Sequence, residues 1–134
     1  PSSPFTRARD YDRAVEMMVE HDANLVVGVR EMEVNSVFVG PIDEQWRITR
    51  IIDQMNANNA SRRQDTDREY TPNGALYLFK WDFFKQHNTI YADRENSFGY
   101  VMDRYHSIEI DEMIDLRWAE FLADKSYVDM SHWI

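Results

Sequence analysis

Apolar side chains recur along the first thirty residues, at first with helical and then with strand-like spacing. Between Asp10 and His21 the apolar positions fall on one face of a helix: Ala14, Val15, Met18 and Val19. A short and mostly apolar run follows at 25–29, and such a run directly after a helix is typical of a strand that a parallel sheet buries on both faces. The pattern predicts a helix to about His21 and a buried strand at 25–29, the second half of a βαβ unit whose first strand would precede Pro1.

The second half of the chain continues the alternation of strands and helices. Apolar runs at 75–79 and 98–102 predict two more strands, and residues 81–87 between them predict a short helix. From Asp111 onward the chain predicts an amphipathic helix with apolar side chains at i, i+4, i+7 and i+8: Ile114, Trp118, Phe121 and Leu122. Alternating helices and apolar strands favour an α/β layered fold.

The segment between Val29 and Tyr70 does not follow this alternation. It holds two short strand-like pieces, at 37–39 and 46–48, which we expect to be strands. A polar stretch at 56–73 is rich in turn-forming residues, so we expect a long exposed loop there.

These patterns divide one partial domain, residues 1–134, into parts. We predict an inserted dimerisation arm and loop at 31–69, and a separate C-terminal part at 70–134. The arm cannot form a core of its own, because glycine, proline and charged residues interrupt its apolar side chains every few positions. We therefore expect a second copy of the chain to cover them in a symmetric dimer. The apolar side chains concerned are Val37, Phe38, Val39, Trp46, Ile48, Ile51 and Ile52.

Charge and composition exclude several classes of function. Among 134 residues, 24 acidic side chains outnumber 15 basic ones, and the formal net charge is −9. Nucleic acids and anionic membranes both demand a basic surface, and no apolar run approaches the roughly 20 residues of a membrane-spanning helix. The chain has no cysteine, which excludes disulfides, thiolate metal ligands and a cysteine nucleophile. We expect neither nucleic acid nor a membrane among its partners.

The most distinctive polar constellation is the stretch 107–112. In strand geometry Ser107, Glu109 and Asp111 project to one face, while the isoleucines between them anchor the other. Two neighbouring carboxylates repel each other unless a cation shares them, and Mg²⁺ takes one or two carboxylates together with substrate phosphates. A divalent-metal site is one interpretation. In the other, Asp111 caps the following helix and Glu109 is a solvated charge.

A second constellation lies in the polar loop. Arg62, Arg63 and Gln64 precede the turn-rich stretch 70–74. Arginines bind phosphates and carboxylates through paired hydrogen bonds, and a turn just before a strand presents backbone groups to a ligand. The alternative is a solvated loop whose arginines offset the acidic residues nearby. His106 lies beside the acidic stretch and is a candidate acid or base, with a surface or supporting role as the alternative.

Several motifs occur in one order along nearly the whole chain. They are Pro1–Phe5, Val26–Val29, Arg63–Gln64, Pro72–Tyr77 and Ser107–Asp111. In this order, and as a set, they resemble the C-terminal part of the acylneuraminate cytidylyltransferases, the CMP-sialic acid synthetases. Each motif alone is weak evidence, whereas the series is specific.

The resemblance implies a Rossmann-like nucleotidyltransferase fold, present as its C-terminal half, and a homodimer formed by exchanging an arm. Enzymes of this family transfer CMP from CTP to the anomeric hydroxyl of a nine-carbon 2-keto sugar acid and release pyrophosphate. By the same resemblance, the cofactor is Mg²⁺ or another divalent cation, the partners are CTP and a nonulosonic (sialic-acid-like) sugar acid, and the enzyme is cytoplasmic.

The family's functional residues carry over to positions that match its motifs. Glu109 and Asp111 match its metal carboxylates, with glutamate where the family usually has aspartate. Arg63 and Gln64 match arm residues near the substrate, and we expect them to take part in catalysis by orienting a substrate anion.

The sugar site is matched at two further places. Asn73 falls in the strand-entry turn near the sugar. The pair Ile90 and Tyr91 matches an apolar pair that packs against it. The resemblance therefore implies substrate-binding roles for these three residues, and it makes 70–134 the C-terminal part that carries the substrate and metal sites.

No segment matches the Gly-, Arg-, Ser- and Lys-rich loop with which the family holds the CTP triphosphate. We therefore expect residues 1–134 alone not to turn over CTP. The alternative function is a non-catalytic dimeric assembly or ligand-binding module that keeps the fold. We also expect the strand at 25–29 to lack its neighbours and to self-associate along an unpaired edge.

Overall fold

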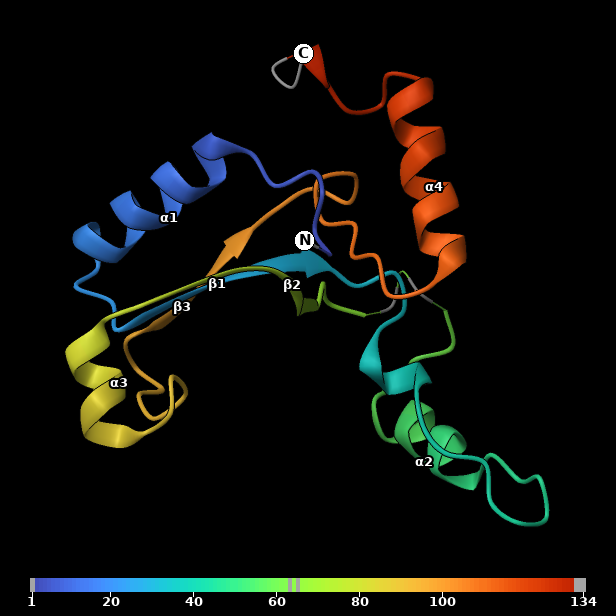
Figure 1. The fold of residues 1–134 in the computed structure, drawn as a ribbon. Helices are drawn as coiled ribbons and strands as arrows, with labels where there is room; N and C mark the ends of the chain where they lie inside the picture. Colours follow the sequence, from blue (N-terminus) through green and yellow to red (C-terminus); the bar gives the residue numbers. More distant parts are fainter. Residues whose placement is uncertain (1, 63, 65, 132–134) are drawn as a thin grey trace. The chain divides into compact units, whose positions relative to one another are not determined.

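A computed structural model describes residues 2–62, 64 and 66–131. Its elements are, in chain order, α1 (Ala8–Glu20), β1 (Leu25–Glu31), a 3₁₀ turn (Ser36–Phe38), α2 (Thr49–Ala57), β2 (Tyr70–Phe79), α3 (Trp81–His87), β3 (Ser97–Val101) and α4 (Met113–Asp124) (Figure 1). The chain divides into two compact units. The sheet unit comprises Pro1–Arg30 and Pro72–Ile134, and the middle unit comprises Glu31–Thr71.

The sheet has three strands in the order β2-β1-β3. β1 pairs with β3 in parallel, with Leu25 opposite Ser97 and Val29 opposite Val101. β2 runs antiparallel to β1, and at one end of the pair the Lys80 backbone N donates to the Asn24 carbonyl at 3.1 Å. The prediction of a buried strand in a parallel pairing is confirmed, as is the α/β class. The prediction of an unpaired edge on this strand is wrong, because β1 is the central strand and both its partners lie in this chain. The Rossmann-like fold stays a prediction.

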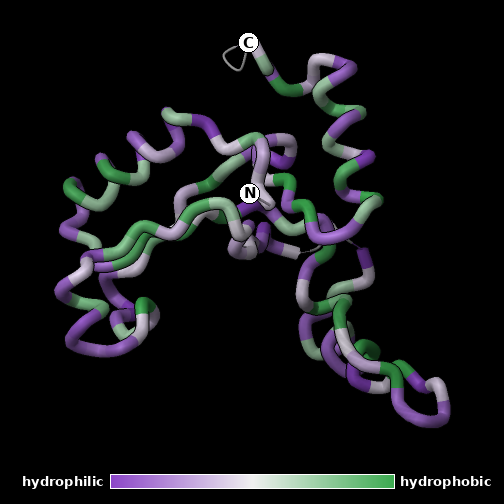
Figure 2. The backbone as a smooth tube through the Cα atoms, in the orientation of Figure 1, coloured by the Kyte–Doolittle hydropathy of each residue, from purple (hydrophilic) through white to green (hydrophobic). Residues whose placement is uncertain are grey.

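Helix α1 packs on the sheet through a different set of residues than the pattern predicts. Ala14 is buried, and Met17 and Met18 pack against the same cluster, which also contains Ala23, Val26 and Leu76. Residues at i, i+3 and i+4 lie on one helix face, which explains this choice. Val15 and Val19, predicted on the buried face, are exposed. In Figure 2, hydrophobic stretches of the chain, coloured green, coincide with strands of the sheet unit.

The start of α1 is held by a buried carboxylate. Arg7 is the N-cap residue, and its backbone N donates to Asp10 Oδ2 at 2.8 Å. The Arg7 guanidinium donates to both Asp10 oxygens, and the Tyr100 hydroxyl donates to Asp10 Oδ1 at 3.0 Å. Burial on its own raises the pKa of Asp10, but the hydrogen bonds from Arg7 and Tyr100 outweigh it and bring the pKa below its ordinary value.

Helix α4 forms as predicted but buries less of its apolar face. Ala119 and Leu122 join Phe5 and Val128 in a second core cluster. The other predicted core residues are substantially exposed: Ile114, Trp118 and Phe121. The N-cap is Glu112, whose backbone N donates to the Asp115 side chain at 2.8 Å, so Asp111 does not have the capping role that the alternative interpretation gave it. None of the helices in the described residues is long and apolar enough to cross a membrane.

The middle unit differs most from the predictions. The expected strand at 37–39 is a 3₁₀ turn that begins after Asn35, whose Oδ1 accepts a hydrogen bond from the Val37 N. Gln54 donates to carbonyls of this segment, which anchors it to α2. The expected strand at 46–48 is absent as well, because Trp46 adopts a left-handed backbone with φ 63°. Side-chain hydrogen bonds to the backbone compete with strand pairing in such segments.

The expected exposed loop at 56–73 is shorter than predicted. Its first residues complete α2, and its last residues, from Tyr70, are the start of β2. Regular helix and strand therefore occupy both ends of the stretch that its turn-forming residues predicted to be a loop. Asn73 in particular is a buried strand residue of β2 and not a loop residue.

Candidate functional site

The site is built where the first half of β2 meets the segment before α4. Residues 107–111 form no strand, so the predicted strand is wrong there. The alternation of its side chains nevertheless holds. Ile108 and Ile110 pack against the core cluster of α4, whereas Ser107 and Glu109 lie against β2. A backbone hydrogen bond from the Ile110 N to the Ser2 carbonyl, at 2.6 Å, also holds this segment.

A buried polar pair joins the two segments. The Asn73 side chain is 2% exposed, and its Nδ2 donates to Ser107 Oγ at 3.1 Å and to Met102 Sδ at 3.2 Å. Its Oδ1 accepts from the Ala75 backbone N at 3.1 Å. Ser107 is itself only 4% exposed. Both ends of the Asn73 amide are therefore engaged inside the sheet unit.

The Glu109 carboxylate lies directly over Gly74. A Cβ atom placed on Gly74 would come within 2.3 Å of Glu109 Oε1 and 2.7 Å of Oε2. Gly74 also has φ +70°, a left-handed conformation that side-chain-bearing residues adopt at a cost. Glycine at this position thus serves both the turn of the backbone and the close approach of the carboxylate.

Tyr77 lies near this carboxylate, and Tyr91 is hydrogen-bonded to Tyr77. Partial burial raises the pKa of the Tyr77 hydroxyl, and the neighbouring Tyr91, the Glu109 carboxylate and a side-chain hydrogen bond with Tyr91 raise it further. The Tyr91 backbone N donates to Thr89 Oγ1 at 3.2 Å, which fixes the turn that carries its ring, and Tyr91 is exposed. Ile90, just before it, is half-buried. The structure thus brings Tyr91 and Glu109 together around Tyr77.

Tyr77 is a candidate functional residue that the sequence reasoning did not single out. It stands four positions after Asn73 in the same motif, and this shared motif was the signal for it. The Tyr77 hydroxyl is neutral at physiological pH, as a tyrosine ordinarily is, and can donate a hydrogen bond; its raised pKa extends this state to more alkaline pH. A carboxylate with two tyrosine hydroxyls can bind a polyhydroxylated or cation-bridged ligand.

The carboxylates expected to hold a metal ion are both exposed. Asp111 follows Glu109 by two residues, and its backbone N donates to the Asp115 side chain at 3.1 Å. No cluster of three or more histidine or acidic side chains suited to a metal ion occurs among the described residues. Two carboxylates still fit Mg²⁺, because this ion commonly takes one or two protein carboxylates and fills its other positions with water and phosphate oxygens.

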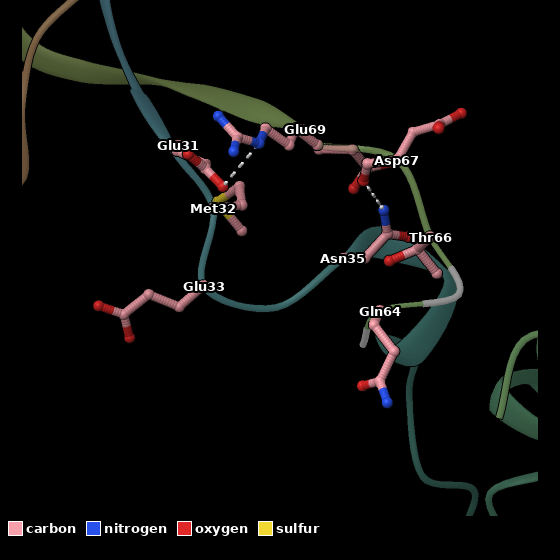
Figure 3. Close-up of a pocket in the computed structure, with 9 residues that line it drawn as sticks. Glu31, Met32, Glu33, Asn35, Gln64, Thr66, Asp67 and Glu69 are labelled. Carbon is pink, nitrogen blue, oxygen red and sulfur yellow. Dashed lines mark hydrogen bonds and ion pairs between the residues drawn. The ribbon is translucent and has the colours of Figure 1, made fainter. Parts of the chain in front are cut away.

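The remaining predicted site residues belong to the polar loop of the middle unit. Arg63 lies outside the described residues. Gln64 is exposed and lines a pocket of about 280 Å³ within the middle unit (Figure 3). Four carboxylates line the same pocket, and one of them, Glu31, pairs with Arg68 at 3.8 Å. The charge of this pocket favours a cationic ligand over a phosphate, and the role of Gln64 toward a substrate anion stays a prediction.

Comparison with known proteins finds N-acylneuraminate cytidylyltransferases over most of the chain and two further relatives over about half of it. An N-acylneuraminate cytidylyltransferase of Streptococcus agalactiae serotype V is 28% identical over 115 residues, which is 85% of this chain and 26% of the relative. A CMP-N,N'-diacetyllegionaminic acid synthase of Campylobacter jejuni subsp. jejuni serotype O:2 is 30% identical over 64 residues, 48% of this chain and 26% of that protein. The post-translational flagellin modification protein B of Campylobacter coli is 29% identical over 69 residues, 52% of this chain and 28% of that protein.

These similarities establish a relationship to the CMP-sialic acid synthetase-like proteins and a resemblance to nucleotidyltransferases. No family model matches the sequence. The chain spans about a quarter of the length of the curated relatives that it matches.

Proposed function

We propose that this chain is the sugar-acid-binding and metal-binding part of a cytidylyltransferase. The enzyme would transfer CMP from CTP to a nonulosonic acid and release pyrophosphate. The observation that carries this proposal is the meeting of Glu109 with Gly74 and Tyr77, whose hydroxyl is hydrogen-bonded to Tyr91, in a chain related to enzymes of that name. The names of the relatives point to sialic or legionaminic acid as the acceptor class.

Glu109 and Asp111 would hold Mg²⁺ or another divalent cation. Bound there, the ion would neutralise phosphate charge. The contribution of the chain is to present the two carboxylates on an extended segment whose isoleucines are packed into the core. Anchoring of this kind sets the direction of the carboxylates before a ligand arrives, which lowers the cost of ordering them on binding.

Tyr77 and Tyr91 would contact the sugar acid. Their hydroxyls share a hydrogen bond, and the Tyr91 ring is exposed for contact with a ligand, with Ile90 beside it. Aromatic rings with a hydroxyl offer an apolar face and a polar tip, which matches a polyhydroxylated sugar. Asn73, which the resemblance also matches to the sugar site, is buried. Arg63 and Gln64 would orient a substrate anion from the loop.

In the proposed reaction the anomeric hydroxyl oxygen of the sugar forms a bond to the α-phosphorus of CTP. The bond from that phosphorus to the pyrophosphate oxygen breaks, and the hydroxyl proton leaves to solvent. No side chain of this site needs to form a covalent bond. Positioning and charge neutralisation supply the catalysis, as they do in phosphoryl transfer generally.

A homodimer through the middle unit is part of the proposal. In this unit several large apolar side chains are exposed, and α2 buries none of its residues. Burying each large apolar side chain contributes about 1.5–3 kcal/mol, so a two-fold partner that covers them would be strongly held. The exposed side chains are Val34, Val39, Ile42, Trp46, Ile48 and Ile52.

The test uses the full-length protein with CTP and Mg²⁺. Pyrophosphate release is measured with a sialic acid, with a legionaminic acid and without an acceptor. We expect release that depends on one of the acids. Glu109→Gln and Asp111→Asn should each lower kcat/KM on the order of 100-fold or more, because each removes a metal-ligand charge worth several kcal/mol in the transition state.

The matched control is Glu20→Gln, at the exposed end of α1. It removes the same charge and should leave the rate unchanged. Unaltered turnover and unaltered Mg²⁺ dependence in Glu109→Gln would contradict the assignment of the site. Absence of any turnover with either acid, in a protein that still binds CTP or the acid, would favour the non-catalytic module.

A further inference from the structure

We propose that Asn73 and Ser107 are positioning residues, which fix the Glu109 carboxylate over Gly74 and beside Tyr77. The ligand-binding role of Glu109 itself rests on the proposed function. The positional effect does not, because it concerns contacts within the chain. Asn73 and Ser107 would thus act through Glu109 and not by touching a substrate.

The burial of this pair is the first argument. Of the described residues, the buried polar or charged ones are Asp10, Asn73 and Ser107, so two of the three meet at this point. Asn73 Nδ2 donates to Ser107 Oγ at 3.1 Å. A buried amide costs free energy unless its hydrogen bonds are made, so the pair strongly favours one register between the two segments.

Two glycines provide the second argument, because each makes room for one polar side chain. A Cβ on Gly28 of β1 would lie 2.7 Å from Asn73 Oδ1, so the Asn73 amide rests on a strand position that has no side chain. A Cβ on Gly74 would lie 2.6 Å from Glu109 Cδ. The Asn73 amide and the Glu109 carboxylate therefore each lie against the backbone of a glycine, where a larger residue would collide with them.

The geometry links the pair to the carboxylate through a short path. Ser107 precedes Glu109 by two residues, and the side chains of both residues contact β2. Asn73 directly precedes Gly74 on the opposing strand. One hydrogen bond between residues 73 and 107 therefore aligns residues 74 and 109. Without it, the segment would keep the packing of Ile108 and Ile110 and the backbone hydrogen bond from Ile110 to Ser2. None of these contacts is made to β2, so the carboxylate could shift along that strand.

The experiment reads the position of Glu109 from Tyr77. Fluorotyrosine is placed at position 77 of the full-length protein without substrate, and its fluorine NMR resonance is recorded. Glu109→Gln calibrates the shift, because the Glu109 charge acts on Tyr77. We expect Ser107→Ala to move the resonance in the same direction, by at least half of that shift. Ser107→Thr, which restores the hydroxyl, should return it toward the wild-type position.

Matched controls separate positioning from general loosening. Ser97→Ala removes a hydroxyl that bonds the Asp93 carbonyl at the start of β3, and it should leave the resonance in place. Gly74→Ala displaces the carboxylate from its other side and should also move the resonance, whereas Gly99→Ala, whose added Cβ meets Val29 and not Glu109, should not. Cooperative thermal unfolding identifies the variants that fold.

Each outcome decides the proposal. An unmoved resonance in folded Ser107→Ala overturns it, and so does a shift that Ser97→Ala reproduces. If Ser107→Ala does not fold, Asn73→Ser takes its place in the same comparison. This variant replaces the amide by a shorter hydroxyl side chain. The proposed function can fail separately: turnover unaffected by Glu109→Gln contradicts that function, while the fluorine shift still reports on the position of Glu109.

Discussion

Asp10→Asn tests how much the buried carboxylate at the start of α1 stabilises the sheet unit. Asp10 is fully buried and accepts four hydrogen bonds, three from Arg7 and one from Tyr100. Asparagine keeps the size, but it replaces one oxygen by an amide nitrogen that cannot accept. Each oxygen accepts two of the four bonds, so the oxygen that is replaced loses both of its bonds, and donors then face a donor. Arg7 keeps only the longer ion pair with Asp103, at 3.7 Å.

The expected loss follows from these contacts. A hydrogen bond to a charged group contributes about 1.5–3 kcal/mol, and breaking a buried ion pair on one side costs about 3–5 kcal/mol. The Arg7 side chain is 21% exposed, so water can partly solvate its charge in the variant, and this lowers the free-energy cost of the substitution. We expect the free energy of unfolding to fall by about 2–4 kcal/mol, measured by urea denaturation followed by circular dichroism.

The pH dependence gives a second, independent readout. Because the folded pKa of Asp10 is lowered, its contribution is fully present above the ordinary value of 3.8 and is lost as the pH falls through the folded value. The difference between the wild type and Asp10→Asn should therefore be constant near neutral pH and should shrink in acid. Asp12→Asn, on the exposed side of the same helix, should change stability by less than about 0.5 kcal/mol. A loss in Asp10→Asn no larger than in this control would refute the reasoning.

Two further predictions concern α4 and the middle unit. Leu122→Ala should lower the free energy of unfolding by about 2–5 kcal/mol, because it empties a fully buried position. Ile114→Ala, at an exposed position of the same helix, should change it by less than about 0.5 kcal/mol. Equal losses in urea denaturation would contradict the assignment of Leu122 to the buried face of α4. The double variant Trp46→Glu and Ile42→Glu should convert the proposed dimer to a monomer in light scattering, whereas Val19→Glu on α1 should not. A wild-type protein that is monomeric at micromolar concentration would remove the dimer from the proposal.

The local pattern was sufficient for the elements of the sheet unit. The strand at 25–29 was predictable because consecutive apolar side chains can be buried together only where both faces of a strand are covered. The helix Trp81–His87 and the start of α4 followed from spacing in the same way. Where several side chains competed for one buried face, spacing was not enough. On α1, Met17 packs against the sheet and Val19 is exposed, because the neighbouring strands decide which face of the helix is buried.

The candidate site shows the same division. The sequence by itself determined which chemistry is present: carboxylates at 109 and 111, an asparagine and a glycine at 73 and 74, and tyrosines at 77 and 91. It also predicted that Ser107 and Glu109 share one side and the isoleucines the other, and this alternation holds although the segment forms no strand. Only the tertiary structure decided that Ser107 reaches Asn73, 34 residues away, and that Glu109 rests on Gly74. Contacts of this kind depend on the path of the chain between the segments, and local periodicity carries no information about that path.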